Sequence, residues 1–131
     1  KKIEITERNC EIELLTRNDY IYNYSEFRKF DSGYDAFYLT KQFCSEFPKT
    51  DLVVGQCHWD YLIPMVAMRL NYTLKSPNKS NLFHRKHELQ YDVNKWKNTA
   101  KIFSKELNLT GNPHTDSAIA YKQIKRQIKY Y

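Results

Sequence analysis

The chain has 131 residues, of which 41% are hydrophobic and 27% are charged, and its formal net charge is +6 at pH 7. This length suits one domain with a modest core, and the positive charge favours anionic partners. No stretch has the apolar length of a membrane span, and the first residues do not resemble a signal peptide. The 3 cysteines show no CxxC spacing, so we expect no disulfide framework and a reducing, cytoplasmic compartment.

Apolar and polar residues alternate near the start of the chain, at Ile3 and Ile5 and again at Ile12 and Leu14. This period of two predicts strands with one solvent-exposed face. Residues 16–19 read as a turn, and residues 20–24 as another strand or an aromatic loop. Arg17 has two interpretations: its planar guanidinium binds phosphate oxygens, or it is a solvated turn residue.

The next elements are a break at Asp31-Ser32-Gly33, a strand over residues 34–40, and a short helical turn over residues 41–47. Asp35 falls among the apolar residues of that strand. Burying a carboxylate there is costly unless it is paired or lies at the open end of the strand.

The apolar run at residues 52–54 ends at Gly55 and predicts a buried strand. A helix over about 58–70 follows, with Asp60 at or beside its N-cap, where the free N–H groups favour a charged carboxylate. A strand at residues 72–74, a turn at 76–78 and a returning strand at 81–83 then predict a hairpin that leads to His84 and His87.

Two further helices are expected in the C-terminal third. The first covers about 92–107, with Asp92 as N-cap, Gly111 as C-terminal cap and a buried stripe that includes Trp96, which we interpret as core or as a sugar platform. The second covers about 115–130, is basic, and is capped by Thr115 or Asp116. It either docks on the domain, touches a membrane surface, belongs to a missing partner segment or presents a solvated face.

This order of elements resembles the acceptor half of glycosyltransferases with the GT-A fold, particularly those of family 2. The resemblance covers roughly residues 30–96. It is carried by Phe30 to Phe37, Trp59-Asp60, the helix ending at Arg69-Leu70, Asn71-Tyr72-Thr73-Leu74, Ser76-Pro77 and Leu82-Phe83-His84. It implies an α/β fold with a mixed, partly open sheet and flanking helices, like the C-terminal half of a nucleotide-diphospho-sugar transferase.

The resemblance also implies roles for individual residues. Asp60 would be the catalytic base, and His84 would contact a divalent metal, Mn or Mg, or the diphosphate. The substrates would be a nucleotide-sugar donor and a glycan or other hydroxyl acceptor. The expected substrate-binding residues are Asp35, Trp59, Tyr61 and His87. For Asp35 the alternative is a cap for the turn at Ser32-Gly33, for Asp60 a plain helix cap, and for Trp59 burial against the sheet.

The sequence departs from the family by lacking both an Asp-x-Asp and a nucleotide-binding half. We therefore expect residues 1–110 to be an acceptor-side fragment of a larger transferase, followed by a basic helix at 111–131, and to be inactive alone. Two other classes stay open. Cys57, His58, His84 and His87 have the ligand types of a zinc site, although their spacing is poor. The tyrosines and the basic last helix suit a nucleic-acid-binding or protein-interaction module without catalysis.

Overall fold

The computed structural model describes residues 10–23, 25–30, 32–87 and 92–131. The elements follow in the order β1 (Glu11–Leu15), β2 (Arg17–Tyr20), β3 (Phe27–Phe30), β4 (Ala36–Tyr38), α1 (Lys41–Glu46), α2 (Trp59–Arg69), β5 (Thr73–Ser76), β6 (Phe83–Arg85), α3 (Val93–Glu106), α4 (Pro113–Gln127) and β7 (Lys129–Tyr130). The strand predicted at Ile3 and Ile5 lies outside the described residues.

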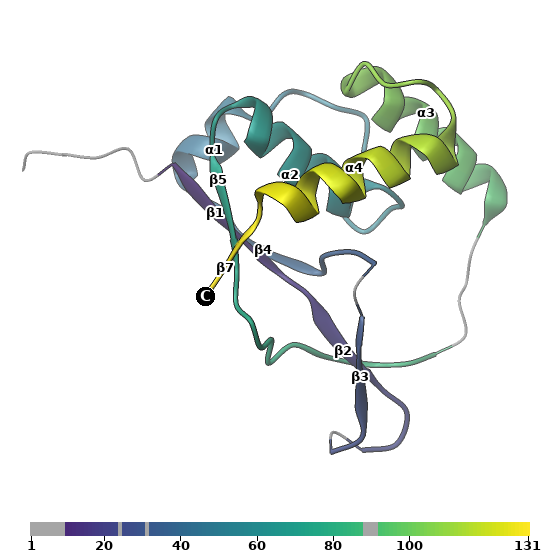
Figure 1. Ribbon diagram of the computed structural model, residues 1–131. Coiled ribbons are helices and arrows are strands. Elements are labelled where there is room, and N and C mark those ends of the chain that lie inside the picture. Colours follow the sequence, from purple (N-terminus) through teal and green to yellow (C-terminus); the bar gives the residue numbers. More distant parts are fainter. Residues whose placement is uncertain (1–9, 24, 31, 88–91) are drawn as a thin grey trace, which may run out of the picture.

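The strands form two open mixed sheets, one of order β4-β1-β5-β7 and one of order β3-β2-β6. Strand β1 pairs antiparallel with β4 and parallel with β5, and β2 pairs antiparallel with β3 and parallel with β6. Strand β1 continues into β2 after Thr16, so this one path joins the two sheets (Figure 1). The predicted α/β class with an open mixed sheet and flanking helices is therefore present, as two sheets.

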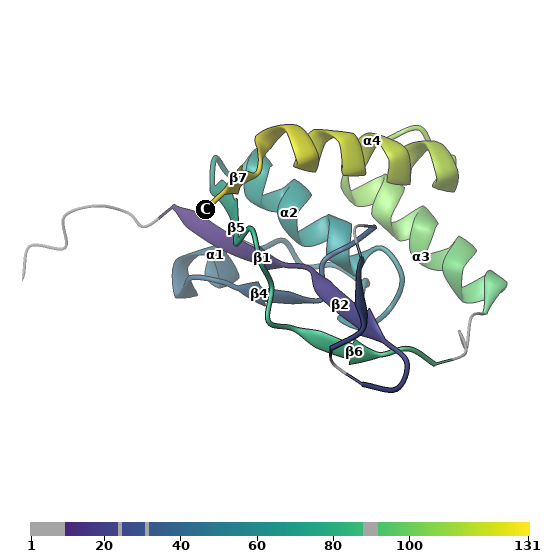
Figure 2. The same cartoon turned by 60° about the horizontal axis from the view of Figure 1, so that its bottom comes forward.

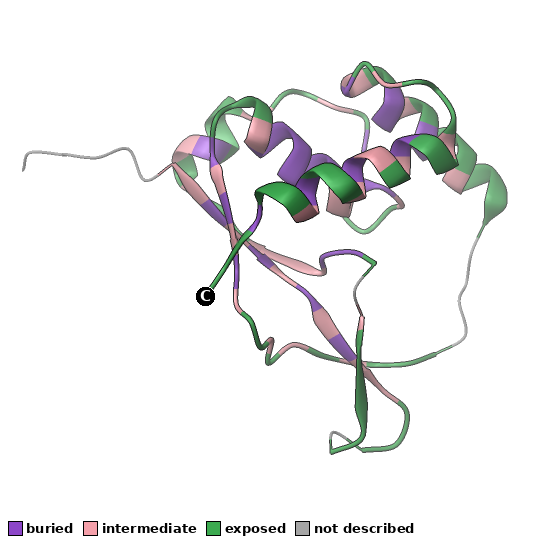
Figure 3. Ribbon diagram, viewed as in Figure 1, coloured by how far each residue is buried: buried purple, intermediate pink, exposed green. Residues whose placement is uncertain are grey.

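Helices α2, α3 and α4 form one layer over the four-stranded sheet (Figure 2). Helix α2 packs against β5 and α4, and α4 also packs against α3 and β5. The core lies between the helices and the sheet (Figure 3), and its fully buried residues include Leu14, Leu74, Phe103 and Ile124. The alternation of β1 places Ile12 and Leu14 on this inner face, as predicted. Within the described residues, no helix is long and apolar enough to cross a bilayer.

The predicted hairpin at residues 72–83 is wrong. Strands β5 and β6 lie in different sheets, and each runs parallel to the β1–β2 path. The signals at Ser76-Pro77-Asn78 mark a change of partner instead of a reversal. The N–H of Tyr131 donates to the carbonyl of Ser76, and the N–H of Asn18 donates to the carbonyl of Leu82, so distant segments satisfy this backbone.

Two predictions before α2 are also wrong. The expected turn at residues 16–19 is mostly strand β2, because its polar side chains pair with each other and with neighbouring segments, as described below. The expected strand at residues 52–54 is irregular. Leu52 is buried, but Val53 and Val54 are 58% and 71% exposed, and Gly55 has a positive φ of 89°, so the segment turns instead of entering a sheet.

The helices agree with their predicted ranges to within about three residues, and Asp92 caps α3 as expected. The other caps differ. Helix α3 ends at Leu107, followed by Asn108 with φ 48°, and not at Gly111. Asn112, and not Thr115 or Asp116, caps α4 by accepting a hydrogen bond from the N–H of Thr115.

Candidate active site

Asp60 lies in the first turn of α2, two residues after the N-cap residue His58, which has a left-handed backbone. Its carboxylate faces Gly33, which is buried in the segment before β4. A Cβ atom at Gly33 would stand only 2.3 Å from Oδ2 of Asp60. The missing side chain at residue 33 therefore makes the room in which this carboxylate is enclosed.

Burial is the main influence on the charge of Asp60, and it raises the pKa of this carboxyl from 3.8 to about 6. The negative charge of Asp35 acts in the same direction. The backbone N–H groups of Asp60, Tyr61 and Tyr34 lower the pKa, but by less. The N–H groups at the helix start thus favour the charged form, as expected, but burial outweighs them, and the carboxylate is still mostly ionised at pH 7.

Two tyrosines hold the segment 32–34 over the start of α2. The hydroxyl of Tyr61 donates a hydrogen bond to the carbonyl of Ser32. Tyr34 is only 3% exposed, and its hydroxyl has no hydrogen-bond partner among the described residues. The sequence pointed to Tyr61 but missed Gly33 and Tyr34, whose only signal is their position directly before Asp35.

A row of polar contacts leads from Asp35 along the three-stranded sheet. Nη1 of Arg17 donates to Oδ1 of Asp35 at 2.6 Å, and Nε of Arg17 donates to Oδ1 of Asp19 at 2.7 Å. The same Asp19 oxygen lies 3.2 Å from Nδ1 of His84. The Arg17 guanidinium also lies over the ring of Phe30, 4.1 Å from its centroid. Arg17 is therefore a fixed, partly buried cation and not the solvated turn residue of one interpretation.

This row joins most of the predicted site residues. Asp35 acts on the pKa of Asp60 at one end, and the rings of His84 and His87 are 5.2 Å apart at the other. Asp60 and His84 form no hydrogen bond or ion pair with each other, and the contacts of Asp35, Arg17 and Asp19 lead from the neighbourhood of Asp60 to His84. Oδ2 of Asp35 is buried and has no hydrogen-bond partner among the described residues, which leaves one acceptor for a ligand.

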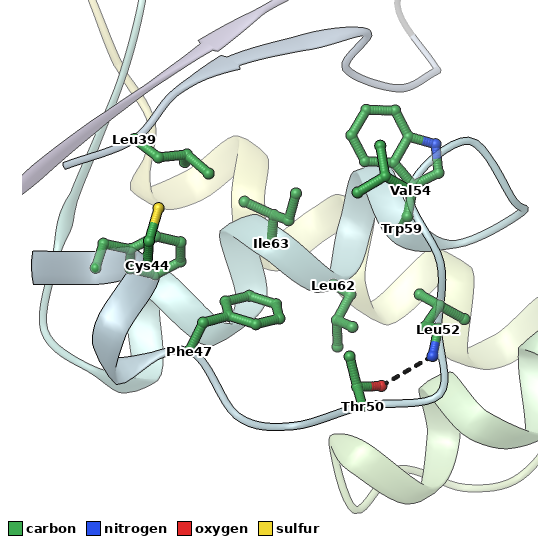
Figure 4. A pocket seen from close by; sticks show the side chains of 10 residues that line it. Leu39, Cys44, Phe47, Thr50, Leu52, Val54, Trp59, Leu62 and Ile63 are labelled. Carbon is green, nitrogen blue, oxygen red and sulfur yellow. Dashed lines mark hydrogen bonds between the residues drawn. The ribbon is translucent and has the colours of Figure 1, made fainter. Parts of the chain in front are cut away.

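Trp59 lies apart from this row. Its ring makes an edge contact with Phe37, at 5.1 Å between centroids, and lines an apolar pocket of about 230 Å³ between α1, α2 and the irregular segment before α2 (Figure 4). The other lining residues are Leu39, Phe43, Cys44, Phe47, Thr50, Leu52, Val54, Leu62 and Ile63. Trp59 is therefore partly buried among mainly apolar side chains, and its contact with Phe37 of β4 agrees with the interpretation as packing against the sheet.

No group of three or more His, Cys, Asp or Glu side chains that could hold a metal ion occurs in the described part of the chain. His84 is engaged with Asp19, which also accepts from Arg17. The absence of such a group also excludes the zinc site considered for Cys57, His58, His84 and His87, all of which are described residues. The buried ring of His58 stacks on Phe103 at 5.4 Å and lies 3.2 Å from the Thr99 hydroxyl, so it belongs to the packing between α2 and α3.

The site is thus a half-buried carboxylate at a helix start, near a charged row that ends at a pair of histidines. Such an arrangement can accept a proton from a bound hydroxyl and can bind polar or anionic groups. Comparisons with protein-family models, with curated proteins and with solved structures found no match to this chain.

Proposed function

We propose that this chain is the acceptor-side part of a GT-A-like, family 2-like glycosyltransferase in which Asp60 is the catalytic base. The environment of Asp60 carries the proposal: its carboxylate is enclosed against Gly33 and has a pKa of about 6. A carboxylate with this pKa is a stronger base than an ordinary aspartate and is still deprotonated at neutral pH. It is therefore suited to taking a proton from an acceptor hydroxyl.

In the proposed reaction, the acceptor oxygen attacks the anomeric carbon of a nucleotide sugar. The bond from that carbon to the diphosphate oxygen breaks, and the leaving diphosphate takes the bonding electrons. The acceptor proton moves to Asp60. Asp35 would accept a hydrogen bond from the acceptor through its unsatisfied Oδ2, while Tyr61 and His87 would shape the surrounding surface. Trp59, which lies in the apolar pocket, has no role in this proposal.

Enzymes of this kind use a divalent metal, Mn or Mg, to neutralise the leaving diphosphate. The described residues do not fit such a centre on their own, since His84 is paired with Asp19 and no group of three ligands is present among them. We therefore assign no step to a metal. The remaining ligands and the nucleotide pocket would come from protein outside this sequence.

The test is release of nucleoside diphosphate from a panel of nucleotide sugars by the complete protein, with and without hydroxyl acceptors. Asp60→Asn keeps the shape of the side chain and should lower acceptor-dependent turnover by roughly 100-fold or more, with little change in donor binding. Asp51→Asn, which changes an exposed acid on the loop before α2, is the matched control. Turnover by Asp60→Asn equal to that of the control would refute the assignment.

A further inference from the structure

The two faces of the three-stranded sheet carry different chemistry. The strand register places Arg17, Asp19 and His84 on the face of the charged row. The opposite side, which we call the outer face, consists of Asn18, Tyr20, Phe27, Lys29, Phe83 and Arg85. None of these residues is acidic, and β3 and β6 each contribute one phenylalanine and one basic residue to this face.

The two phenylalanines of the outer face are exposed to solvent, whereas Tyr20 is half-buried. Phe27 and Phe83 are 51% and 38% exposed, and their rings make an edge contact with centroids 5.4 Å apart. Asn18, on the strand between them, is only 5% exposed, and its side-chain amide donates to the carbonyl of Ser80. The rings thus form a small aromatic platform on this face of the three-stranded sheet.

The position of this sheet leaves the platform accessible. Strands β2 and β3 extend away from the helix layer (Figure 1), and β3 is exposed over most of its length (Figure 3). Lys29 on β3 and Arg85 on β6 are exposed on the strands that flank β2. Cations therefore lie on both sides of the aromatic rings.

We propose that the outer face binds single-stranded nucleic acid. Unpaired bases present flat π faces that stack on aromatic side chains, and phosphates pair with Lys and Arg. Two competing polymers fit less well. A duplex keeps its bases stacked inside, and an anionic polysaccharide needs hydrogen-bond partners for its hydroxyls. The neutral amide of the outer face, Asn18, is buried and already donates to Ser80.

The test is fluorescence anisotropy of a labelled oligothymidylate, about 12 nucleotides long to suit a site of this kind, titrated with the full chain. Phe27→Ala with Phe83→Ala should weaken binding about tenfold or more. Phe27→Leu keeps an apolar side chain and should also weaken binding, which separates lost stacking from lost folding. Unchanged affinity in both variants, each checked for its folded circular dichroism spectrum, would overturn the proposal.

The role of charge is tested by salt dependence with a matched control. Lys29→Gln with Arg85→Gln should reduce the slope of log K against log salt by about 1.4, because each of the two lost phosphate contacts contributes about 0.7. Lys122→Gln with Arg126→Gln removes the same charge from exposed sites on α4. This control pair should leave the affinity for oligothymidylate and its salt dependence unchanged. Equal losses in both pairs, or equally tight binding of a sulfated polysaccharide or of duplex DNA, would overturn the proposal.

Discussion

Asp60 lies between groups that act on its charge in opposite directions. Burial and the neighbouring Asp35 favour the protonated form, whereas backbone N–H groups at the start of α2 favour the carboxylate. Burial is the larger influence, and the pKa of about 6 is the result. This balance makes the pKa of Asp60 the most informative property of the site at the level of single residues.

Asp35→Asn should lower the pKa of Asp60. The substitution removes the like charge that favours protonation of Asp60 and keeps the size of the side chain. The measurement is a pH titration of the Asp60 carboxyl carbon by NMR. Asp51→Asn, at an exposed position, is the control and should leave the titration unchanged. A pKa that stays the same or rises in Asp35→Asn would contradict this interpretation.

Asp60→Asn should make the stability of the fold less dependent on pH. The folded-state pKa of Asp60 is raised, so its contribution to stability is fully present below pH 3.8 and is lost as the pH rises through about 6. The variant is neutral throughout this range. The free energy of unfolding of the variant, relative to that of the wild type, should therefore increase by up to about 3 kcal/mol between pH 4 and pH 7, as measured by urea unfolding. A constant difference across this range would be the contrary result.

Gly33→Ala should destabilise the fold by about 1–3 kcal/mol, because its Cβ would stand 2.3 Å from Oδ2 of Asp60. The cause is the close carboxylate and not a special backbone conformation. In an Asp60→Ala background the same change should therefore cost much less. A double-mutant cycle of unfolding free energies measures this coupling. Purely additive costs would mean that Gly33 does not make room for Asp60.

At the scale of elements, Asp116 fixes the connection between α3 and α4. Its side chain is fully buried and accepts hydrogen bonds from the Ser104 hydroxyl, from the N–H and hydroxyl of Thr110, and from the N–H of Gly111. These bonds lower its pKa although burial acts against them. The sequence suggested Asp116 as a cap for α4, but its carboxylate binds the loop between α3 and α4 and the Ser104 hydroxyl on α3 instead.

Asp116→Asn should destabilise the protein by about 2–4 kcal/mol at pH 7, because an amide cannot accept from all of these donors. Since the pKa of Asp116 is lowered, its stabilisation is present above the ordinary aspartate pKa and is lost as the pH falls through the folded-state value. The difference between variant and wild type in urea unfolding should therefore shrink in acid. An equally large difference at low pH would contradict this role.

The helices were predictable from the sequence because their signals are local. Apolar spacing over a few turns places Leu62 and Phe103 in the core, and both are buried. Strand pairing is not local. Residues 76–83 carry ordinary hairpin signals, yet β6 pairs with β2, more than 60 residues earlier in the chain. Turn chemistry alone could not reveal that partner.

The candidate site was predictable only in part for the same reason. Asp60 and Asp35 were recognisable as acids beside apolar segments, and the structure brings their charges close enough to interact. Arg17 and Asp19 looked like turn residues because their partners, Asp35 and His84, are remote in sequence. Polar residues on a strand are informative only after the neighbouring strands are known.

At the scale of the whole molecule, the β1–β2 path ties the helix layer to the exposed three-stranded sheet (Figure 1). The charged row and the outer face lie on opposite faces of the three-stranded sheet, and Asp60 lies on α2, outside that sheet. The two proposals are therefore separable: variants of Phe27 and Phe83 should leave the titration of Asp60 unchanged, and Asp60→Asn should leave binding of oligothymidylate unchanged.

The pH dependence of sugar transfer by the complete protein tests the assignment of Asp60 most directly. If Asp60 is the base, kcat/KM should rise with pH through a midpoint of about 6, as the carboxyl ionises. In Asp35→Asn this midpoint should move to lower pH, in step with the pKa measured by NMR, and in Asp60→Asn the rise should disappear with the activity. A midpoint that does not respond to Asp35→Asn, or an unchanged profile in Asp60→Asn, would contradict the assignment.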